Sequence, residues 1–434
     1  MSTPSIILPP SLVLPFSQED IEQAIKTNGW KTPFHLYSGE VIQETARRLN
    51  TAFRKQGFDF KNHYAVKALP NPHILQILAG EWMWMDCSSI PEIHLAQMVG
   101  VTDEGIMFTS NNTSVEDFAI ATEAGAIINL DDFSHIAKLE SVGLPSLVCC
   151  RYNPGEAKEG NSIIGESIKQ KFGMRKDQII EAYRLLKEKW VQRFGLHAMM
   201  VSNERREDAL IENARLLFEL AWEIYAQTWV TFEFINLGGG IGVPYRPDAL
   251  PDDTYTNHEV DLDIFAKGVR IEYDKIFWEK LGNPKIFMEN GRYVTGPAGA
   301  LIARVRNIAK KYATFVWVDA NMSSLMRPGM YGAYHHINVI GKEHLPHDHV
   351  YHVTGDLCEN NDQFTAGTPR MLPGIKEWDT IAIHTTGAHA DAMTFNYNSK
   401  LRSPGLLQDL NGDIRIIKNG ETEEDLFRNI VPLT

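Results

Sequence analysis

The sequence is poor in cysteine, in long apolar runs and in positive charge. Four cysteines occur among 434 residues, and their spacing matches neither a disulfide framework nor a zinc site. Their scarcity is typical of a protein kept in a reducing cytoplasm. No apolar run reaches the ~18 residues needed to span a bilayer. The net charge of −13 would repel nucleic acids and anionic membrane surfaces, so we expect neither as a partner.

The remaining composition is that of an ordinary globular protein. Hydrophobic residues make up 44% of the chain and charged residues 22%. The length suits two domains or one large one. The first residues, MSTPSIILPPSLVLPF, lack the basic start of a signal peptide and contain four prolines. We expect them to form a packed arm.

Short apolar runs rich in β-forming residues recur from about residue 63 and predict eight strands. The runs are HYAVKA (63–68), MWMDCSS (83–89), GIMFTS (105–110), AIINL (126–130), SLVCCRYN (146–153), LHAMMVS (196–202), FEFINLG (232–238) and KIFMEN (285–290).

Segments with helical spacing lie between most of these runs. The clearest is REDALIENARLLFELAWEIYAQ, and NPHILQILAG and PEIHLAQMVG each begin near a proline and end with a glycine. Eight nearly continuous apolar strands alternating with helices predict a (β/α)8 TIM-like barrel, whose strands are covered on both faces. A doubly wound open sheet is the alternative.

The pattern changes after about residue 295. Stretches such as DTIAIHTTGA and DIRIIKNGE alternate like half-exposed strands, which predicts a mostly antiparallel C-terminal β domain. We expect FHLYS (34–38) to add a strand to it. The predicted division is therefore 1–38 for the arm and this strand, 39–294 for the barrel, and 295–434 for the β domain.

Polar residues occur repeatedly where the predicted strands end. In a barrel of this kind the active site lies at the C-terminal ends of the strands. Any one of these residues could instead be a capping or loop residue, but their recurrence after strand upon strand favours a site. They are Lys67, Asp86, Ser88, Ser110, Arg151, Ser202, Gly238, Gly239, Gly240 and Glu289.

Lys67 is surrounded by apolar residues in YAVKAL. Taken alone, such a lysine fits a structural ion pair or a side chain that reaches solvent at least as well as catalysis. If the strand buries it, desolvation would lower the pKa of its ammonium and give a nucleophilic amine. Such an amine suits a Schiff base with a carbonyl cofactor.

Two further segments are suited to a phosphorylated cofactor. NLGGGIG (236–242) would bring backbone N–H groups against a phosphate, although three glycines can also be a flexible turn. Glu289 could hold the ring nitrogen of pyridoxal phosphate protonated, which makes the ring an electron sink. The alternative for Glu289 is a surface salt bridge with Arg292.

Together these motifs resemble the alanine-racemase-like group of pyridoxal-phosphate enzymes, and within it diaminopimelate decarboxylase and the related ornithine and D-amino-acid decarboxylases. The resemblance runs from about residue 32 to 420. It is carried by YAVKALPNP, MDCSSIPEI, NLGGGIG, ENGR, LMRPGMYGAYH, GDLCENND and GAHADAMTFNYN.

The resemblance implies pyridoxal 5'-phosphate as cofactor and a homodimer with composite active sites. Lys67 would carry the cofactor, and Cys358 of the partner subunit would protonate the substrate carbon after CO2 leaves. The implied cofactor-binding residues are Lys67, Asp86, Arg151, His197, Ser202, Gly238, Gly239, Gly240, Gly242, Glu289, Gly291, Arg292, His389 and Tyr397. The implied substrate-binding residues are Arg292, Arg327, Tyr331 and Glu359.

The substrate expected from this constellation is meso-diaminopimelate, giving L-lysine and CO2. Its distal carboxylate suits arginine and its distal ammonium suits Glu359. Asn290 replaces a family proline, His389 replaces a tyrosine, and Met199 falls where a histidine stacks on the cofactor ring, a role that His197 could take over. These departures keep decarboxylation of D-lysine, D-ornithine or another D-amino acid as an alternative. A non-catalytic binding or regulatory homologue is the alternative of a different class.

Overall fold

The computed structural model describes residues 9, 12–155, 170–277 and 281–433. Most of the predicted N-terminal arm, residues 1–8 and 10–11, lies outside them. Contacts divide the chain into two units, one formed by residues 43–243 and 259–293 and the other by residues up to 42, 244–258 and from 294 onward. None of the helices in the described ranges combines the length and the apolar character needed to cross a bilayer.

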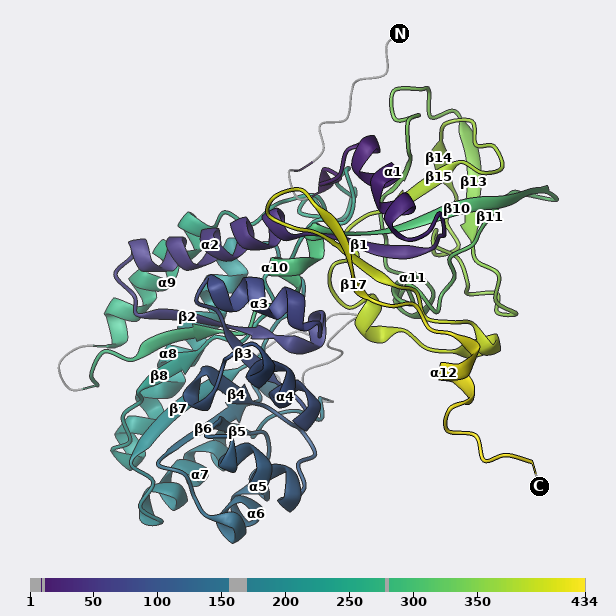
Figure 1. Cartoon of the computed structure of the whole chain (residues 1–434). Helices are drawn as coiled ribbons and strands as arrows, with labels where there is room; N and C mark the ends of the chain where they lie inside the picture. The colour runs from purple at the N-terminus through teal and green to yellow at the C-terminus, as the bar shows by residue number, and fades with distance from the viewer. Residues whose placement is uncertain (1–8, 10–11, 156–169, 278–280, 434) are drawn as a thin grey trace. The chain divides into compact units, whose positions relative to one another are not determined.

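The first unit is a closed barrel of eight parallel strands (Figure 1). Each strand pairs with the next in chain order, and β9 pairs with β2 to close the ring. The predicted barrel is confirmed, and the open sheet is excluded. The strands are β2 (Phe60–Ala65), β3 (Trp84–Cys87), β4 (Ile106–Phe108), β5 (Ile127–Leu130), β6 (Leu147–Tyr152), β7 (Arg193–Ala198), β8 (Phe234–Asn236) and β9 (Lys285–Met288).

Helices cover the outside of the barrel. In α8 the buried residues recur every three or four positions, which is the amphipathic pattern of a helix on a sheet. In α3 the Asn71 side chain caps the first turn by accepting from the His73 N–H at 3.0 Å, as the NPH start predicts. The helices are α2 (Gly39–Lys55), α3 (Pro72–Gly80), α4 (Ile90–Met98), α5 (Val115–Glu123), α6 (His135–Val142), α7 (Lys176–Glu188), α8 (Glu207–Thr228), α9 (Leu262–Ile276) and α10 (Arg292–Thr295).

The second unit is a mostly antiparallel β domain. Its strand β1 (Phe34–Ser38) pairs antiparallel with β10 and parallel with β16, so the predicted FHLYS strand does join this sheet. The other elements are α1 (Gln18–Thr27), β10 (Gly299–Lys310), β11 (Thr314–Val318), α11 (Arg327–Tyr331), β12 (Ile337–Val339), β13 (His349–Thr354), β14 (Arg370–Leu372), β15 (Thr380–Ile383), β16 (Gly405–Gln408), β17 (Ile414–Lys418) and α12 (Glu423–Phe427).

Five exposed tryptophans adopt left-handed backbone conformations, which the sequence does not predict. A side chain at such a φ clashes with its own carbonyl, so glycine or asparagine is usual there. Trp190, for example, lies two residues beyond the end of α7, has φ 69° and is 87% exposed. The five are Trp30, Trp82, Trp190, Trp229 and Trp378.

Replacing Trp190 with asparagine is expected to raise the free energy of unfolding by about 1 kcal/mol, because asparagine tolerates this conformation. Denaturant unfolding of the cofactor-free protein measures the change. The control is Trp222→Asn inside α8, where the backbone is helical, so no strain is relieved and the contact of the indole with Tyr225 is lost. This variant should not gain stability. A loss of stability in Trp190→Asn would mean that contacts of the indole outweigh the backbone strain.

Candidate active site

Lys67 lies just beyond β2, in the 3₁₀ turn Val66–Ala68. Its side chain is 54% exposed, and its Nζ is 3.6 Å from Oδ2 of Asp86. The prediction of a buried lysine inside the strand is therefore wrong, because the strand ends at Ala65 and the chain turns before the lysine. An amine that is reachable from solvent and paired with a buried carboxyl is still placed to react with a carbonyl compound.

Asp86 is buried at the end of β3, and neither carboxylate oxygen has a hydrogen-bond partner among the described residues. Burial raises the pKa of Asp86 to about 8, the nearby Glu289 adds to the effect, and Lys67 opposes it. Because folding raises this pKa, the proton on Asp86 stabilises the folded state. That contribution to the free energy of unfolding is complete below the ordinary pKa of an aspartate and is lost as the pH rises through about 8.

Changing Asp86 to asparagine should therefore remove a pH-dependent loss of stability. In the cofactor-free protein, the unfolding temperatures of Asp86→Asn and wild type should match near pH ~4 and differ by ~2 °C or more near pH ~9. Calorimetry across this range measures the difference. Asp252→Asn, at an exposed carboxyl, should follow wild type throughout. Parallel curves for Asp86→Asn and wild type would refute the raised pKa.

Glu289 follows β9 and is 8% exposed. Its Oε1 accepts from Asn236 Nδ2 at 2.7 Å, and its Oε2 lies 3.3 Å from Nε2 of His197. Burial acts to raise the pKa of Glu289, but His197 and the charges of Lys67 and Arg151 outweigh it and hold the pKa below its ordinary value. The alternative of a surface salt bridge with Arg292 is thereby excluded, because the carboxylate is buried and its partners are Asn236 and His197.

The glycine loop follows β8 and packs closely on its neighbours. Gly238 and Gly240 have φ values of +70° and +101°, and a Cβ on Gly240 would lie 2.4 Å from the Val201 carbonyl oxygen. The loop after β7 meets it through the backbone of Glu204, whose N–H donates to the Gly240 oxygen at 2.9 Å and whose carbonyl oxygen accepts from the Gly242 N–H at 2.7 Å. Ser202 lies in this β7 loop, four residues beyond the strand rather than at its end.

Several other predicted residues of the barrel lie at the same strand ends. Arg151, on β6, donates to Asp131 at 3.0 Å. Gly291 packs so closely that a Cβ would meet the Ala68 methyl at 2.7 Å, beside Lys67. Arg292 begins α10 directly after it. These contacts bring the Lys67, Asp86, Glu289 and glycine-loop segments together within one unit.

Three buried asparagines complete this network, and the sequence analysis missed them. Asn62, Asn129 and Asn236 are at most 2% exposed and stand in the apolar strands β2, β5 and β8. A buried amide needs hydrogen-bond partners, so an asparagine within an apolar strand already indicates a polar network in the sequence. Asn62 accepts from the Asn290 N–H at 2.9 Å, which a proline at position 290 would lack.

The β domain carries three of the four predicted substrate residues, since Arg292 lies in the barrel unit. Arg327 begins α11 and is 4% exposed; its Nη1 is 2.9 Å from Nε2 of His335, and its guanidinium lies 4.7 Å from the Tyr245 ring. His335 in turn contacts the His384 carbonyl oxygen through Nδ1 at 2.8 Å. The arginine is thus held in one orientation by two aromatic rings. Tyr331, at the end of the same helix, is exposed.

The remaining predicted residues lie in loops of the β domain. Cys358 is exposed, and its backbone N–H donates to Asn398 Oδ1 at 2.7 Å, which brings it to the turn that begins at Tyr397. Glu359 is exposed beside it, and its carboxylate accepts from the Asn361 N–H. His389 has a left-handed φ of 55°. The thiol and carboxylate of this segment are available to a ligand.

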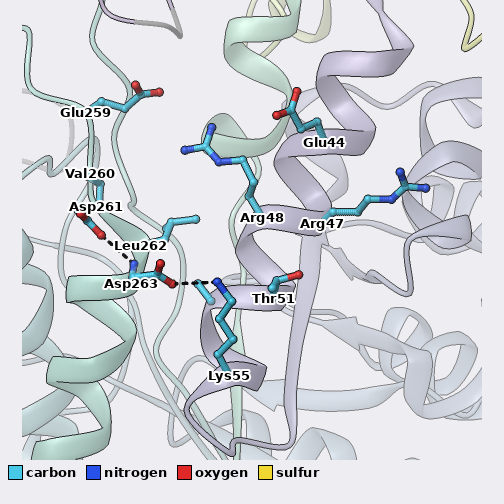
Figure 2. Close-up of a pocket in the computed structure, with 11 residues that line it drawn as sticks. Glu44, Arg47, Arg48, Thr51, Lys55, Glu259, Val260, Asp261, Leu262 and Asp263 are labelled. Carbon is cyan, nitrogen blue, oxygen red and sulfur yellow. Dashed lines mark hydrogen bonds and ion pairs between the residues drawn. The ribbon is translucent and has the colours of Figure 1, made fainter.

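A cleft of about 470 Å³ on the outside of the barrel contains none of the predicted site residues (Figure 2). Basic residues of α2 face acidic residues at the start of α9. Lys55 lies 3.8 Å from Asp263, and Asp261 caps α9 by accepting from two backbone N–H groups. Ion pairing and helix capping account for these charges, so we place the active site at the strand ends.

Comparison with known proteins identifies the family. The sequence profile described as "Pyridoxal-dependent decarboxylase, pyridoxal binding domain" matches residues 40–296. The chain belongs to the pyridoxal-dependent decarboxylase family. Protein TabA of Pseudomonas amygdali pv. tabaci is 37% identical to this decarboxylase over 399 residues, 92% of this chain and 91% of TabA. Diaminopimelate decarboxylase of Methanothermobacter thermautotrophicus is 33% identical over 401 residues, 92% and 91% of the two chains.

The fold of the decarboxylase is shared with solved relatives. Diaminopimelate decarboxylase of Methanocaldococcus jannaschii in complex with L-lysine matches it with a TM-score of 0.84 at 28% identity, covering 95% of this chain and 94% of that one. The decarboxylase is accordingly a carboxy-lyase whose cofactor is pyridoxal phosphate.

The residues of this decarboxylase fit the cofactor. The glycine loop packs too closely on the residues after β7 and on Glu289 to admit a Cβ, and a glycine-rich loop of this kind lets the backbone approach a phosphate. Both carboxylate oxygens of Asp86 are buried without a hydrogen-bond donor among the described residues, and the Lys67 amine is accessible. Lys67, the glycine loop and Glu289 would therefore hold the aldehyde, the phosphate and the ring nitrogen respectively.

Proposed function

We propose that this decarboxylase converts meso-diaminopimelate to L-lysine and CO2. The observation that carries the proposal is Arg327, a buried guanidinium held in place by His335 and Tyr245 in the segment predicted to bind substrate. A fixed, planar guanidinium suits a carboxylate, which it can bind through two parallel hydrogen bonds. The similarity to diaminopimelate decarboxylases over nine-tenths of the chain supports the same substrate.

The residues divide the work of the reaction. When bound, the cofactor withdraws electrons from the substrate carbon as CO2 leaves. Lys67 would hold the cofactor and yield its place to the substrate amine, and Glu289 would keep the ring nitrogen protonated. Arg292, Arg327 and Tyr331 would bind the distal carboxylate, and Glu359 the distal ammonium. The Cys358 thiol would give its proton to the carbon that loses CO2.

We also propose that the active sites are composite, in a homodimer. Each would combine Lys67 and the glycine loop of one chain with Cys358 and Glu359 of the partner subunit, and the exposure of both residues supports this. Four free thiols, three of them buried, suit a reducing compartment such as the cytoplasm.

Decarboxylation of a D-amino acid is the second candidate. It is favoured by Met199, which stands where the family carries a ring-stacking histidine and whose sulfur accepts from the Gly239 N–H at 3.2 Å. His389 and Asn290 are the other departures within the cofactor-binding segments. A thioether offers packing but no ring nitrogen at that position, which would alter the pocket.

The deciding experiment measures CO2 release by the protein loaded with pyridoxal phosphate. The substrates are meso-diaminopimelate, D-lysine, D-ornithine, L-lysine and L-ornithine. We expect the highest kcat/KM for meso-diaminopimelate, with Arg327→Met raising its KM. A preference for a D-amino acid with one carboxylate would assign the pocket to the second candidate. No CO2 release from any of them would favour a binding or regulatory protein.

A further inference from the structure

The Glu289 carboxylate is fixed by protein groups on several sides. Asn236 donates to Oε1 at 2.7 Å, and the Glu289 backbone N–H donates to the Gly238 oxygen at 2.8 Å. The orientation of the Asn236 amide is fixed, because its Oδ1 accepts from the Gly238 N–H at 2.9 Å and a flipped amide would place an NH2 group against that donor. One asparagine thus ties the glycine loop after β8 to Glu289 after β9, so a single side chain links the two ends of the cofactor site.

His197 faces the second oxygen of Glu289 from inside the barrel. The imidazole is 1% exposed, and its Nε2 lies 3.3 Å from Oε2, long for a hydrogen bond but within the range of an ion-pair contact. The ring is not aligned for a hydrogen bond to Oε2. At this separation a carboxylate still attracts a proton on Nε2 and repels a lone pair there, which favours the proton on Nε2. Contacts of this kind often shorten when the site is filled.

Asn129 supplies the matching contact on the other ring nitrogen. Its Nδ2 lies 2.8 Å from Nδ1 of His197 and 3.1 Å from Oγ1 of Thr109. An amide NH2 can only donate, so Nδ1 must accept and the ring proton stays on Nε2. β5, β6 and β7 pair in sequence and hold this asparagine opposite the histidine.

The geometry points to His197 as a positioning residue, kept by Asn129 as the Nε2-protonated tautomer so that, together with Asn236, it orients Glu289 toward the cofactor. This differs from the ring-stacking role expected from the sequence, since His197 acts here through Glu289. The inference rests on the proposed function only in assigning Glu289 to the cofactor ring nitrogen.

Two replacements of His197 separate the two ring positions. Glutamine places its amide near the position of Nε2 and can still donate to Glu289, whereas asparagine reaches only the position of Nδ1. We expect His197→Asn to lower kcat/KM by about tenfold to a hundredfold, the effect of losing one hydrogen bond to a charged group. His197→Gln should stay within about threefold of wild type.

The visible absorbance spectrum of the bound cofactor depends on the contact of Glu289 with the ring nitrogen. A change at His197 that affected only the stability of the fold would leave this spectrum unchanged. His197→Asn should shift it in the direction of Glu289→Gln, and His197→Gln should not. An unchanged spectrum and activity in Glu289→Gln would instead show that the Glu289 assignment is wrong. If Glu289→Gln has its effect but the two His197 variants behave alike, the positioning role is overturned.

The tautomer can be measured without any loss of folding. ¹⁵N NMR of the cofactor-free wild-type chain, labelled at histidine, will show several neutral rings among the 15 histidines. The ring whose signal is missing from the His197 variants should be neutral and protonated at Nε2. A proton on Nδ1 would mean that the Asn129 amide is turned the other way and would overturn the inference. One of the two variants is enough for the assignment, and His197→Gln, the more conservative change, serves if His197→Asn fails to fold.

Discussion

Changing Lys67 to alanine is expected to abolish CO2 release and the covalent attachment of pyridoxal phosphate. The Lys67 amine is half exposed at the C-terminal end of the barrel and stands 3.6 Å from Asp86. Alanine offers no nucleophile at this place, so the cofactor could be held only by its phosphate and ring contacts. We expect less than about 0.1% of wild-type turnover, a loss of more than ~4 kcal/mol of transition-state stabilisation.

Borohydride reduction followed by peptide mass analysis checks the attachment directly. In wild type the reduced cofactor should be found on the peptide that contains Lys67. Lys61→Ala is the matched control, because Lys61 is on β2, the strand that leads into the turn with Lys67, and lies over the Trp84 ring, 4.9 Å from its centre. Wild-type turnover in Lys67→Ala, or cofactor on another lysine, would contradict the assignment.

Changing Cys358 to alanine should lower kcat by about 10²–10⁴-fold and leave KM nearly unchanged, because it removes a proton donor without changing the groups proposed to bind substrate. The thiol is exposed and its backbone is anchored to Asn398, so the substitution should leave the fold intact. Steady-state CO2 release measures both constants. Asn360→Ala, at an exposed neighbour, should retain wild-type values.

Mixing inactive chains tests whether the sites are shared. If each site takes Lys67 from one chain and Cys358 from the partner subunit, a Lys67→Ala chain and a Cys358→Ala chain would together form one native site in each mixed dimer. Equal mixing should then restore about a quarter of the wild-type activity. Exchange of subunits without any recovery would show that each site is complete within one chain.

The fold is predictable because the eight barrel strands are nearly continuous apolar runs with polar residues at their ends. The Lys67, Glu289 and glycine-loop segments were found for the same reason. Strand ends were predicted less well: β2 stops at Ala65, and the following turn carries Lys67 out toward solvent. At a strand end, the conformation of the next few residues decides whether a side chain is buried, and the apolar composition of the segment does not determine that conformation.

The partners of the site residues could not be predicted. Asn129 meets His197 only because β5 and β7 both pair with β6 in the barrel, and Arg327 meets His335 through the course of a loop. A sequence gives the residue types of such pairs but not which side chains will face one another. The sequence shows a histidine at position 197, but its role depends on its contacts with Asn129 and Glu289, which only the structure gives.

The place of β1 in the β domain has a consequence for synthesis on the ribosome. Residues 34–38 emerge early, yet their neighbours in the sheet are residues 299–302 and 405–408. At ~5–20 residues per second, this strand waits roughly 10–60 s for the first of them, while the whole barrel is made. The nascent chain therefore carries an unpaired apolar strand edge through most of its translation, and a chaperone that covers FHLYS during that interval would protect it from aggregation.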